Sequence, residues 1–205
     1  MCSRQIFSSA VSCDAEKLDI NRFIGGAFLR YDTAFTVITT RERWNRMLDN
    51  LFLIGKLWEV YGFSPRYKVF PLGTVYHIVD PTGIEGMLRV VDSGRDHRTF
   101  LANGRMRNWY IPVTLTGRVL FLFRYSDEQG KVFVRLSVYG EGSENRIEQM
   151  MLRVLAPLLN VYIDRRITRN LRDLNMIITD MERSPDLIRG KIAGIYLEDF
   201  NRLVE

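Results

Sequence analysis

Cysteine is scarce in this 205-residue chain and long apolar runs are missing from it. The only cysteines, Cys2 and Cys13, lie near the N-terminus, so the sequence offers no disulfide framework and no cysteine-based metal site. The run "IFSSAV" is too short for a secretory signal, since charged residues follow it at once. No window approaches the ~20 apolar residues that a membrane-spanning helix needs. These absences predict a cytoplasmic protein.

Recognisable catalytic motifs are also lacking. The sequence contains no serine nucleophile elbow, no Walker loop and no dinucleotide-binding fingerprint. Its two histidines, His77 and His97, have no second histidine or cysteine at metal-ligand spacing. His77 could serve as a general base if it pointed into a cavity, but a hydrogen-bonded histidine in the core or at a strand edge is favoured. We therefore expect no catalytic residue, no metal and no cofactor, and we favour a noncatalytic protein over an enzyme.

Positive charge exceeds negative charge only slightly. The formal net charge is +5, which permits anionic partners but lacks the dense basic stripe of a nucleic-acid binder. One loop, "NGRMRNWYIP" (103–112), combines Arg105 and Arg107 with Trp109. Basic and aromatic residues together suit a peripheral contact with a membrane surface or stacking on nucleic acid, of which we favour the membrane. The alternative is that Trp109 packs under its own loop while the arginines are solvated.

The first half of the chain carries strong signals for a strand followed by helices. "AFTVIT" (34–39) is a β-branched, apolar run of strand length. Thr40 is suited to cap a helix, and apolar residues then recur at helical spacing from Trp44 to Tyr61. Gly55 is predicted to divide this stretch into two short helices.

Between residues 66 and 140, short apolar segments alternate with turn signals, which predicts an antiparallel meander. The clearest hairpin joins residues 119–125 to residues 131–139. In its first arm both faces are apolar, because Phe121 and Phe123 alternate with Leu120 and Leu122. We predict that the two phenylalanines point inward, with Val134 and Leu136 opposite.

A long amphipathic helix is predicted after the last strand. Ser143 is a suitable N-cap, and an apolar stripe continues as far as Met181, over some 38 residues. Pro157 lies within the stripe and should kink the helix. Residues 186–205 are predicted to form another amphipathic helix, which Gly190 and Gly194 weaken.

The order of these elements resembles the START-like, or helix-grip, superfamily. The similarity is sharpest at "AFTVITTRERWNRMLDN" (34–50) and at "SENRIEQMMLRVLAPLL" (143–159). The resemblance implies an α+β fold in which a curved antiparallel sheet wraps around a long C-terminal helix. We predict an irregular N-terminal arm over residues 1–26, a START-like domain over 27–165 and a helical extension over 166–205, the first and last having no counterpart in the minimal fold.

Members of this superfamily commonly bind lipids, sterols, polyketides or hormones between the sheet and the helix, and some are cyclases or hydrolases. The resemblance therefore implies noncatalytic binding of a hydrophobic small molecule or lipid. The predicted lining residues are Leu88, Val90, Phe121, Phe123, Val134, Leu136, Met150, Met151, Val154 and Leu158. The alternatives are a protein-interaction or self-association module with a filled core and, less favoured, a cyclase-like enzyme.

The extension needs a surface to cover its apolar stripe, because an isolated amphipathic helix is marginal in water. From Ile167 to Met181 this stripe extends beyond the length of helix that a small sheet can cover. Either residues 186–205 fold back onto it or a second subunit covers it. We predict both, with a homodimer formed through residues 166–205.

Overall fold

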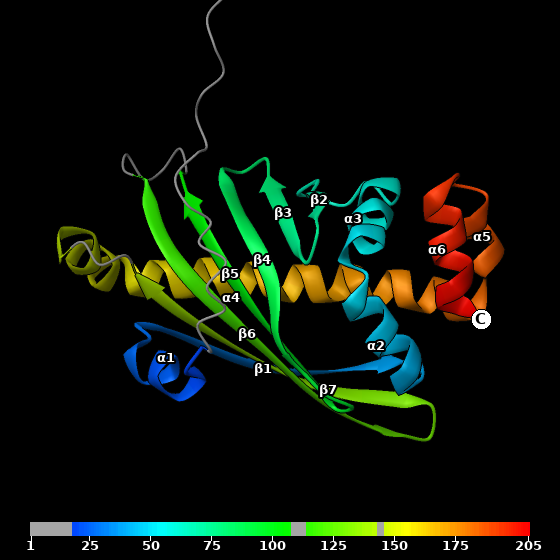
Figure 1. The fold of residues 1–205 in the computed structure, drawn as a ribbon, viewed down its shortest axis with the longest axis horizontal. Coiled ribbons are helices and arrows are strands. Elements are labelled where there is room, and N and C mark those ends of the chain that lie inside the picture. Colours follow the sequence, from blue (N-terminus) through cyan, green and yellow to red (C-terminus); the bar gives the residue numbers. More distant parts are fainter. Residues whose placement is uncertain (1–17, 108–113, 143–145) are drawn as a thin grey trace, which may run out of the picture.

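The fold is an antiparallel sheet with helices on both faces, described by a computed structural model over residues 18–107, 114–142 and 146–205. In chain order the elements are α1 (Ile20–Gly26), β1 (Leu29–Ile38), α2 (Arg41–Asp49), α3 (Leu51–Val60), β2 (Lys68–Leu72), β3 (Val75–Asp80), β4 (Ile84–Ser93), β5 (His97–Met106), β6 (Leu115–Glu128), β7 (Lys131–Gly142), α4 (Arg146–Arg183), α5 (Pro185–Arg189) and α6 (Ile195–Val204). Figure 1 shows the curved sheet with α4 crossing behind it. This arrangement confirms the predicted α+β fold class.

The seven strands follow the order β1-β7-β6-β5-β4-β3-β2, and every neighbouring pair is antiparallel. Alternation along β7 separates buried Val132, Val134, Leu136 and Val138 from exposed or half-buried residues between them. Because directly opposed residues share a face, this register fixes the two faces of the whole sheet. We call the face that carries Val134 and Leu136 the inner face and the opposite face the outer face.

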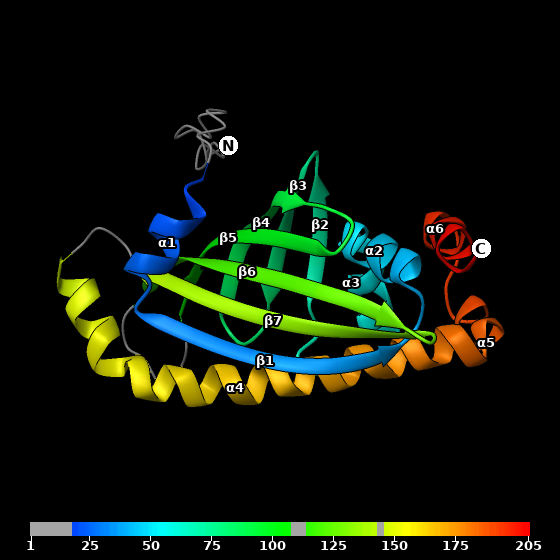
Figure 2. The same ribbon diagram turned by 90° about the horizontal axis from the view of Figure 1, so that it is seen from below.

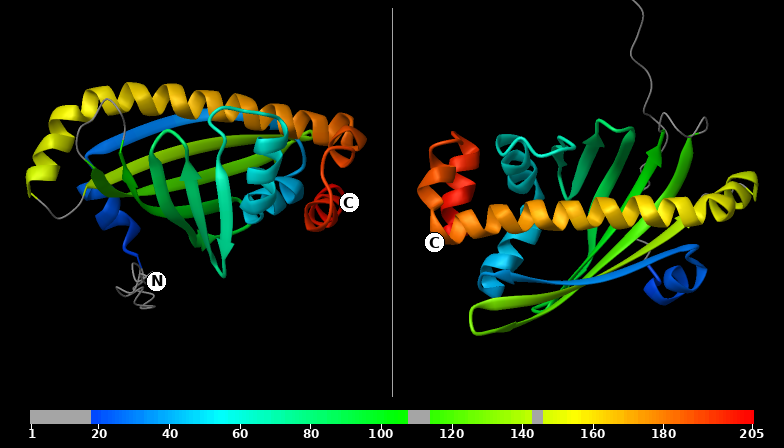
Figure 3. Two further views of the ribbon diagram at one scale, coloured as in Figure 1. Left: turned by 90° about the horizontal axis from the view of Figure 1, so that it is seen from above. Right: turned by 180° about the vertical axis from the view of Figure 1, so that it is seen from behind.

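The inner face is partly covered by α4, which packs Leu152 and Leu159 against Leu136 and Val138. Figure 3 shows α4 running alongside β1, while β2 to β5 curve away from it. Pro157 lies inside this 38-residue helix. The N-terminal part of α4 bends relative to the remainder (Figure 2), as expected where proline removes a backbone donor. The predicted cap at Ser143 lies outside the described residues.

The predicted pair of short helices is present, but it divides at Asn50 and not at Gly55. Thr40 caps α2 as predicted, its side chain accepting a hydrogen bond from the amide of Arg43. Asn50 ends α2 and caps α3 by accepting from the amide of Leu53. Gly55 instead lies within α3, where an added Cβ would come within 2.5 Å of Val69 on β2. This glycine therefore permits close packing of helix on strand.

The C-terminal segment folds back in part onto α4, as one of the two predicted arrangements required: α5 contacts α4, whereas α6 packs mainly against α2, α3 and α5. Ile188 of α5 and Phe200 of α6 are buried in one cluster with Ile177 and Ile178 of α4. The predicted single helix is wrong in one respect, because it is broken into α5 and α6. Gly190 ends α5, and Gly194 precedes α6 with φ of +59°, a conformation that favours glycine.

The N-terminal arm predicted to be irregular up to residue 26 contains the helix α1. Asp19 caps it by accepting from the amide of Arg22, a signal that the sequence analysis missed. Phe23 of α1 packs against Leu101 and Leu120 on the outer face. This contact explains why both faces of β6 are apolar.

Four glycines lie directly opposite one another across four neighbouring strands. Gly86 of β4 pairs with Gly104 of β5, Gly104 with Gly117 of β6, and Gly117 with Gly142 of β7. A Cβ added to Gly86, Gly104 or Gly117 would come within 2.7 Å of a backbone carbonyl oxygen on the adjacent strand. Only glycine fits so close an approach of strands. We call these residues the glycine row; it crosses the inner face.

No helix in the described ranges is long and apolar enough to cross a membrane.

Candidate functional site

The inner face of β3, β4 and β5 is the candidate functional site because its side chains are incompletely covered. Val90 pairs with the inner-face Phe100, yet 39% of it is exposed. Leu88 and Ile78, which share this face, are half-buried. By contrast, the inner-face residues Val134 and Leu136 of β7 are buried. The cover provided by α4 thus extends over β1, β7 and β6 more fully than over the other strands.

Six of the predicted lining residues lie on this inner face. They are Leu88, Val90, Phe121, Phe123, Val134 and Leu136, as the strand register requires. Phe123 packs edge-on between Trp44, at 6.5 Å between ring centroids, and Phe100, at 5.9 Å. Phe121 contacts both main core clusters. The two phenylalanines therefore point inward, as predicted.

The four predicted lining residues on α4 have a different outcome. Met150 is 65% exposed, so its prediction as part of the covered stripe is wrong. It belongs to the N-terminal turns of α4, which bend relative to the rest of the helix (Figure 2). Met151, Val154 and Leu158 lie on the same helix, but their side chains are outside the described part of the structure.

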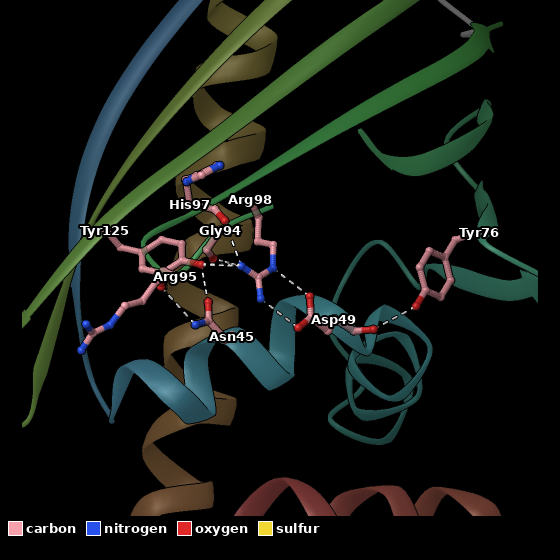
Figure 4. Close-up of polar contacts among 8 residues, drawn as sticks. All are labelled: Asn45, Asp49, Tyr76, Gly94, Arg95, His97, Arg98 and Tyr125. Carbon is pink, nitrogen blue, oxygen red and sulfur yellow. Dashed lines mark hydrogen bonds and ion pairs between the residues drawn. The ribbon is translucent and has the colours of Figure 1, made fainter. Parts of the chain in front are cut away.

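At one end of the inner face, a buried arginine ties β5 to α2 (Figure 4). Arg98 donates from Nε and Nη2 to the two carboxylate oxygens of Asp49, at 2.8 and 2.9 Å. Its Nη1 donates to the carbonyl oxygens of Gly94 and His97 and to the hydroxyl of Tyr125. Bonding to Asp49 raises the pKa of Arg98, with burial opposing.

The same network extends to three further hydrogen bonds, visible in Figure 4. The Tyr125 hydroxyl donates to Asn45, whose Nδ2 donates to the carbonyl of Arg95 at 3.2 Å. Tyr76 of β3 donates to the backbone carbonyl of Asp49 at 3.1 Å. We call the group of Arg98, Asp49, Tyr125, Asn45 and Tyr76 the Arg98 cluster. No buried side-chain polar atom of these five residues lacks a hydrogen bond, although the buried indole nitrogen of Trp44, whose ring packs on Tyr125 at 6.2 Å, has no partner among the described residues.

Toward the opposite end, a second arginine joins α4 to β3 and to Tyr67, the residue before β2. Arg166 donates from Nη2 to the buried carboxylate of Asp80 and from Nε to the hydroxyl of Tyr67 at 2.9 Å. Asn170, one turn further along α4, donates from Nδ2 to the same hydroxyl at 2.8 Å. Asp80 also accepts from the amide and hydroxyl of Thr82. We call Arg166, Asp80, Tyr67 and Asn170 the Arg166 cluster.

The Arg166 cluster leaves polar atoms without partners. The Oδ1 atom of Asn170 is buried and accepts no hydrogen bond from any described residue. The indole nitrogen of Trp58 is likewise buried and unbonded within the described residues, and its ring packs against Tyr67 at 5.6 Å. Burial raises the pKa of Tyr67, against the opposing effects of Arg166 and Asn170, so its hydroxyl carries a proton. Buried polar atoms without partners are rare and mark places where a ligand or water binds.

The polar residues singled out from the sequence lie away from the inner face. His77 lies on the outer face and bonds to Glu85 at 3.0 Å, which confirms the hydrogen-bonded histidine. Arg105 pairs with the same carboxylate at 2.7 Å, and Trp109 lies outside the described residues. Glu85 has a lowered pKa because Arg105 and then His77 donate to it.

His97 contacts Asp92 and Asp96 on the outer face. In the described ranges, no three His, Cys, Asp or Glu side chains are grouped so as to hold a metal ion. An open groove of about 810 Å³ lies mainly along the outer face, with Leu122, Arg124 and Arg135 in its lining. Two predicted binding residues, Phe123 and Val134, also border it, although the strand register directs their side chains to the inner face.

Sequence reasoning missed the Arg166 cluster entirely. The arginine that reaches the sheet, Arg166, and its partner Asp80 were given no role there. Asp80 also forms a turn with Thr82. Isolated polar residues on a predicted apolar helix, such as Asn170, were the available signal.

Comparison with known proteins supports the fold and leaves the sequence family open. No protein-family model matches the chain, and no curated protein matches it in sequence. A START superfamily protein from Mycobacterium smegmatis is similar in structure, with a TM-score of 0.50 and 8% identity, over 74% of this chain and 98% of that one. A conserved protein from Geobacillus kaustophilus aligns with a TM-score of 0.48 and 17% identity, over 74% and 96%.

The likeness to the mycobacterial protein rests on shared architecture, since the identity is too low to indicate a shared site. A curved antiparallel sheet and a long C-terminal helix are common to this chain and to the arrangement predicted from its sequence. The chain therefore has the START-like, helix-grip fold.

Proposed function

We propose that this protein binds a hydrophobic small molecule or lipid, without catalysis, between the inner face of β3–β5 and α4. The observation that carries the proposal is the exposure of Val90 on the face that the fold otherwise buries. Apolar side chains left partly uncovered beside a packed core favour occupation by an apolar molecule. The START-like fold adds support, because its members commonly bind such ligands in this position.

The proposed site lies between the two arginine clusters. On β4, Leu88 and Val90 lie between Ile84 and Ser93. Ile84 pairs with Asp80 of the Arg166 cluster, and Ser93 pairs with Arg98 of the Arg98 cluster. The residues proposed to contact the ligand are Leu88, Val90, Phe121 and Phe123, with Val134 and Leu136 beside them on β7 and Met151, Val154 and Leu158 contributed by α4. Met150 is left out because it is exposed.

Two measurements test the proposal. Native mass spectrometry of the gently purified protein should reveal a co-purifying apolar molecule. Equilibrium dialysis against naphthalene should give saturable binding that Val90→Trp weakens at least about tenfold, because the indole would fill the uncovered space.

A matched control is available on the other side of the sheet. Phe133 is 44% exposed on the outer face, so Phe133→Trp should leave naphthalene binding unchanged. Equal loss of binding in both variants, or a wild-type protein with no bound molecule and no naphthalene binding, would overturn the proposal.

Self-association through residues 166–205 stays a proposal beside this function. Met176 on α4, Leu187 on α5 and Ile195 on α6 remain exposed after the fold-back. Exposed apolar residues on a rigid surface favour association. We propose a cytoplasmic location on the basis of the cysteine pattern, and a peripheral membrane contact through Arg105, Arg107 and Trp109 on the basis of their residue types alone.

A further inference from the structure

We propose that Asn170 and Tyr67 form a hydrogen-bonding site for a hydroxyl group on an otherwise apolar ligand. This inference rests on the proposed function, since it concerns the polar end of a ligand held on the inner face. It identifies the ligand as amphipathic, with one uncharged polar group, and distinguishes it from a plain hydrocarbon.

The position of the Arg166 cluster supports this assignment. Asp80 pairs in register with Ile84 of β4, so its side chain lies on the inner face, and Arg166 reaches it from α4. Gly86 and Leu88 are the next inner-face residues along β4 after Ile84. A ligand lying against Leu88 and Val90 therefore has one end toward the Arg166 cluster.

The Arg166 cluster contains a hydrogen-bond donor and an acceptor that its own members do not use. The Tyr67 hydroxyl accepts from both Arg166 and Asn170, and among the described residues its own proton has no acceptor. The Oδ1 atom of Asn170 has no donor there either. One free donor and one free acceptor thus flank the same hydroxyl.

Reversing the Asn170 amide does not remove the deficit. In the reversed orientation the Tyr67 hydroxyl would donate to Oδ1, but Nδ2 would then lack an acceptor. A hydroxyl group both donates and accepts, so it satisfies the cluster in either orientation. Uncharged ligand groups are favoured over anions, because the charge of Arg166 is already neutralised by Asp80.

A pair of probes that differ by one hydroxyl group tests the inference. Equilibrium dialysis should measure the Kd of naphthalene and of 2-naphthol for the wild type, for Asn170→Leu and for Asn45→Leu. For each variant we compare the Kd of naphthalene divided by the Kd of 2-naphthol. The two probes differ in hydration by the same amount in every experiment, so this difference cancels when the ratio is compared between variants. Asn170→Leu should lower the preference for 2-naphthol about 3- to 10-fold, as expected for one net hydrogen bond.

The control variant places the same substitution in the Arg98 cluster, where no polar atom is free. Asn45→Leu should keep the wild-type preference, and both variants should bind naphthalene within about twofold of the wild type. An unchanged preference in Asn170→Leu would mean that an ordered water fills the site, and it would overturn the inference while the proposed function stands. Failure of the wild type to bind either probe would overturn the proposed function itself.

Discussion

Arg98 is buried and Arg166 half-buried, and both are paired with an aspartate at the inner face, yet their surroundings differ. Arg98 donates to two backbone carbonyls and a tyrosine besides its partner Asp49, which is 52% exposed. Arg166 pairs with Asp80, which is only 3% exposed, and its neighbours keep unpaired polar atoms. Each cluster has an unbonded buried indole nitrogen beside it, that of Trp44 or of Trp58. The difference lies in the members themselves, because among the described residues only Asn170 of the Arg166 cluster keeps an unpaired buried oxygen.

This difference separates a structural closure from a candidate site. A buried polar network with every member bonded fixes one arrangement of helix and sheet, whereas a partly bonded one has a free-energy cost that a ligand or water relieves. The exposure of the two aspartates also matters, because a carboxylate left in water is solvated and a buried one is not.

The largest loss of stability is expected from Arg166→Met. It leaves the charge of Asp80 buried with only Thr82 to bond it, which should lower the free energy of unfolding by about 3–5 kcal/mol. Urea denaturation followed by circular dichroism measures this. The double variant Arg166→Met, Asp80→Asn should recover at least half of the loss. If the double variant is less stable than Arg166→Met alone, the buried charge is not the cause.

Arg98→Met is expected to have a smaller effect, about 2–3 kcal/mol, although Arg98 makes more hydrogen bonds. Asp49 remains half-exposed and solvated, so the main cost is the loss of donors to Gly94, His97 and Tyr125. The same denaturation experiment checks the order. A loss greater than that of Arg166→Met would contradict the importance assigned to the exposure of the aspartates.

The smallest effects come from identical substitutions in the two clusters. Asn45→Leu removes two hydrogen bonds, one from Tyr125 and one to Arg95, and should cost about 1–2 kcal/mol. Asn170→Leu removes one bond together with a buried unpaired oxygen, so it should stay within about 1 kcal/mol of the wild type. Both positions gain similar helix propensity. Thermal unfolding of the two variants side by side would decide the matter, and equal losses would argue against a free acceptor at Asn170.

The elements that could be predicted from the sequence are those set by local patterns. Alternation along residues 131–139 gave the inner face of β7, and Thr40 was recognisable as a helix cap because its bonding partner lies three residues away. The length of α4 followed from its apolar stripe. Such signals depend on neighbours in the chain, which a single sequence displays directly.

The arginine clusters could not be predicted because their members are distant in sequence. Arg98 and Asp49 are 49 residues apart, and Arg166 and Asp80 are 86 residues apart, so no local spacing records either contact. The break between α2 and α3 was misplaced for a related reason. Glycine usually weakens a helix, so Gly55 was interpreted as the point of division. Its role is instead to let α3 pack closely against Val69 of β2, a contact that the local sequence does not reveal.

The glycine row restricts which substitutions this protein can accept during evolution. The atoms that exclude a Cβ at Gly86, Gly104 and Gly117 belong to the backbones of adjacent strands and not to side chains. A neighbouring side chain can be shortened by mutation, but a carbonyl oxygen cannot. No second substitution elsewhere can therefore make room for an alanine in the row, and a lineage that keeps this curvature keeps its glycines at all three positions.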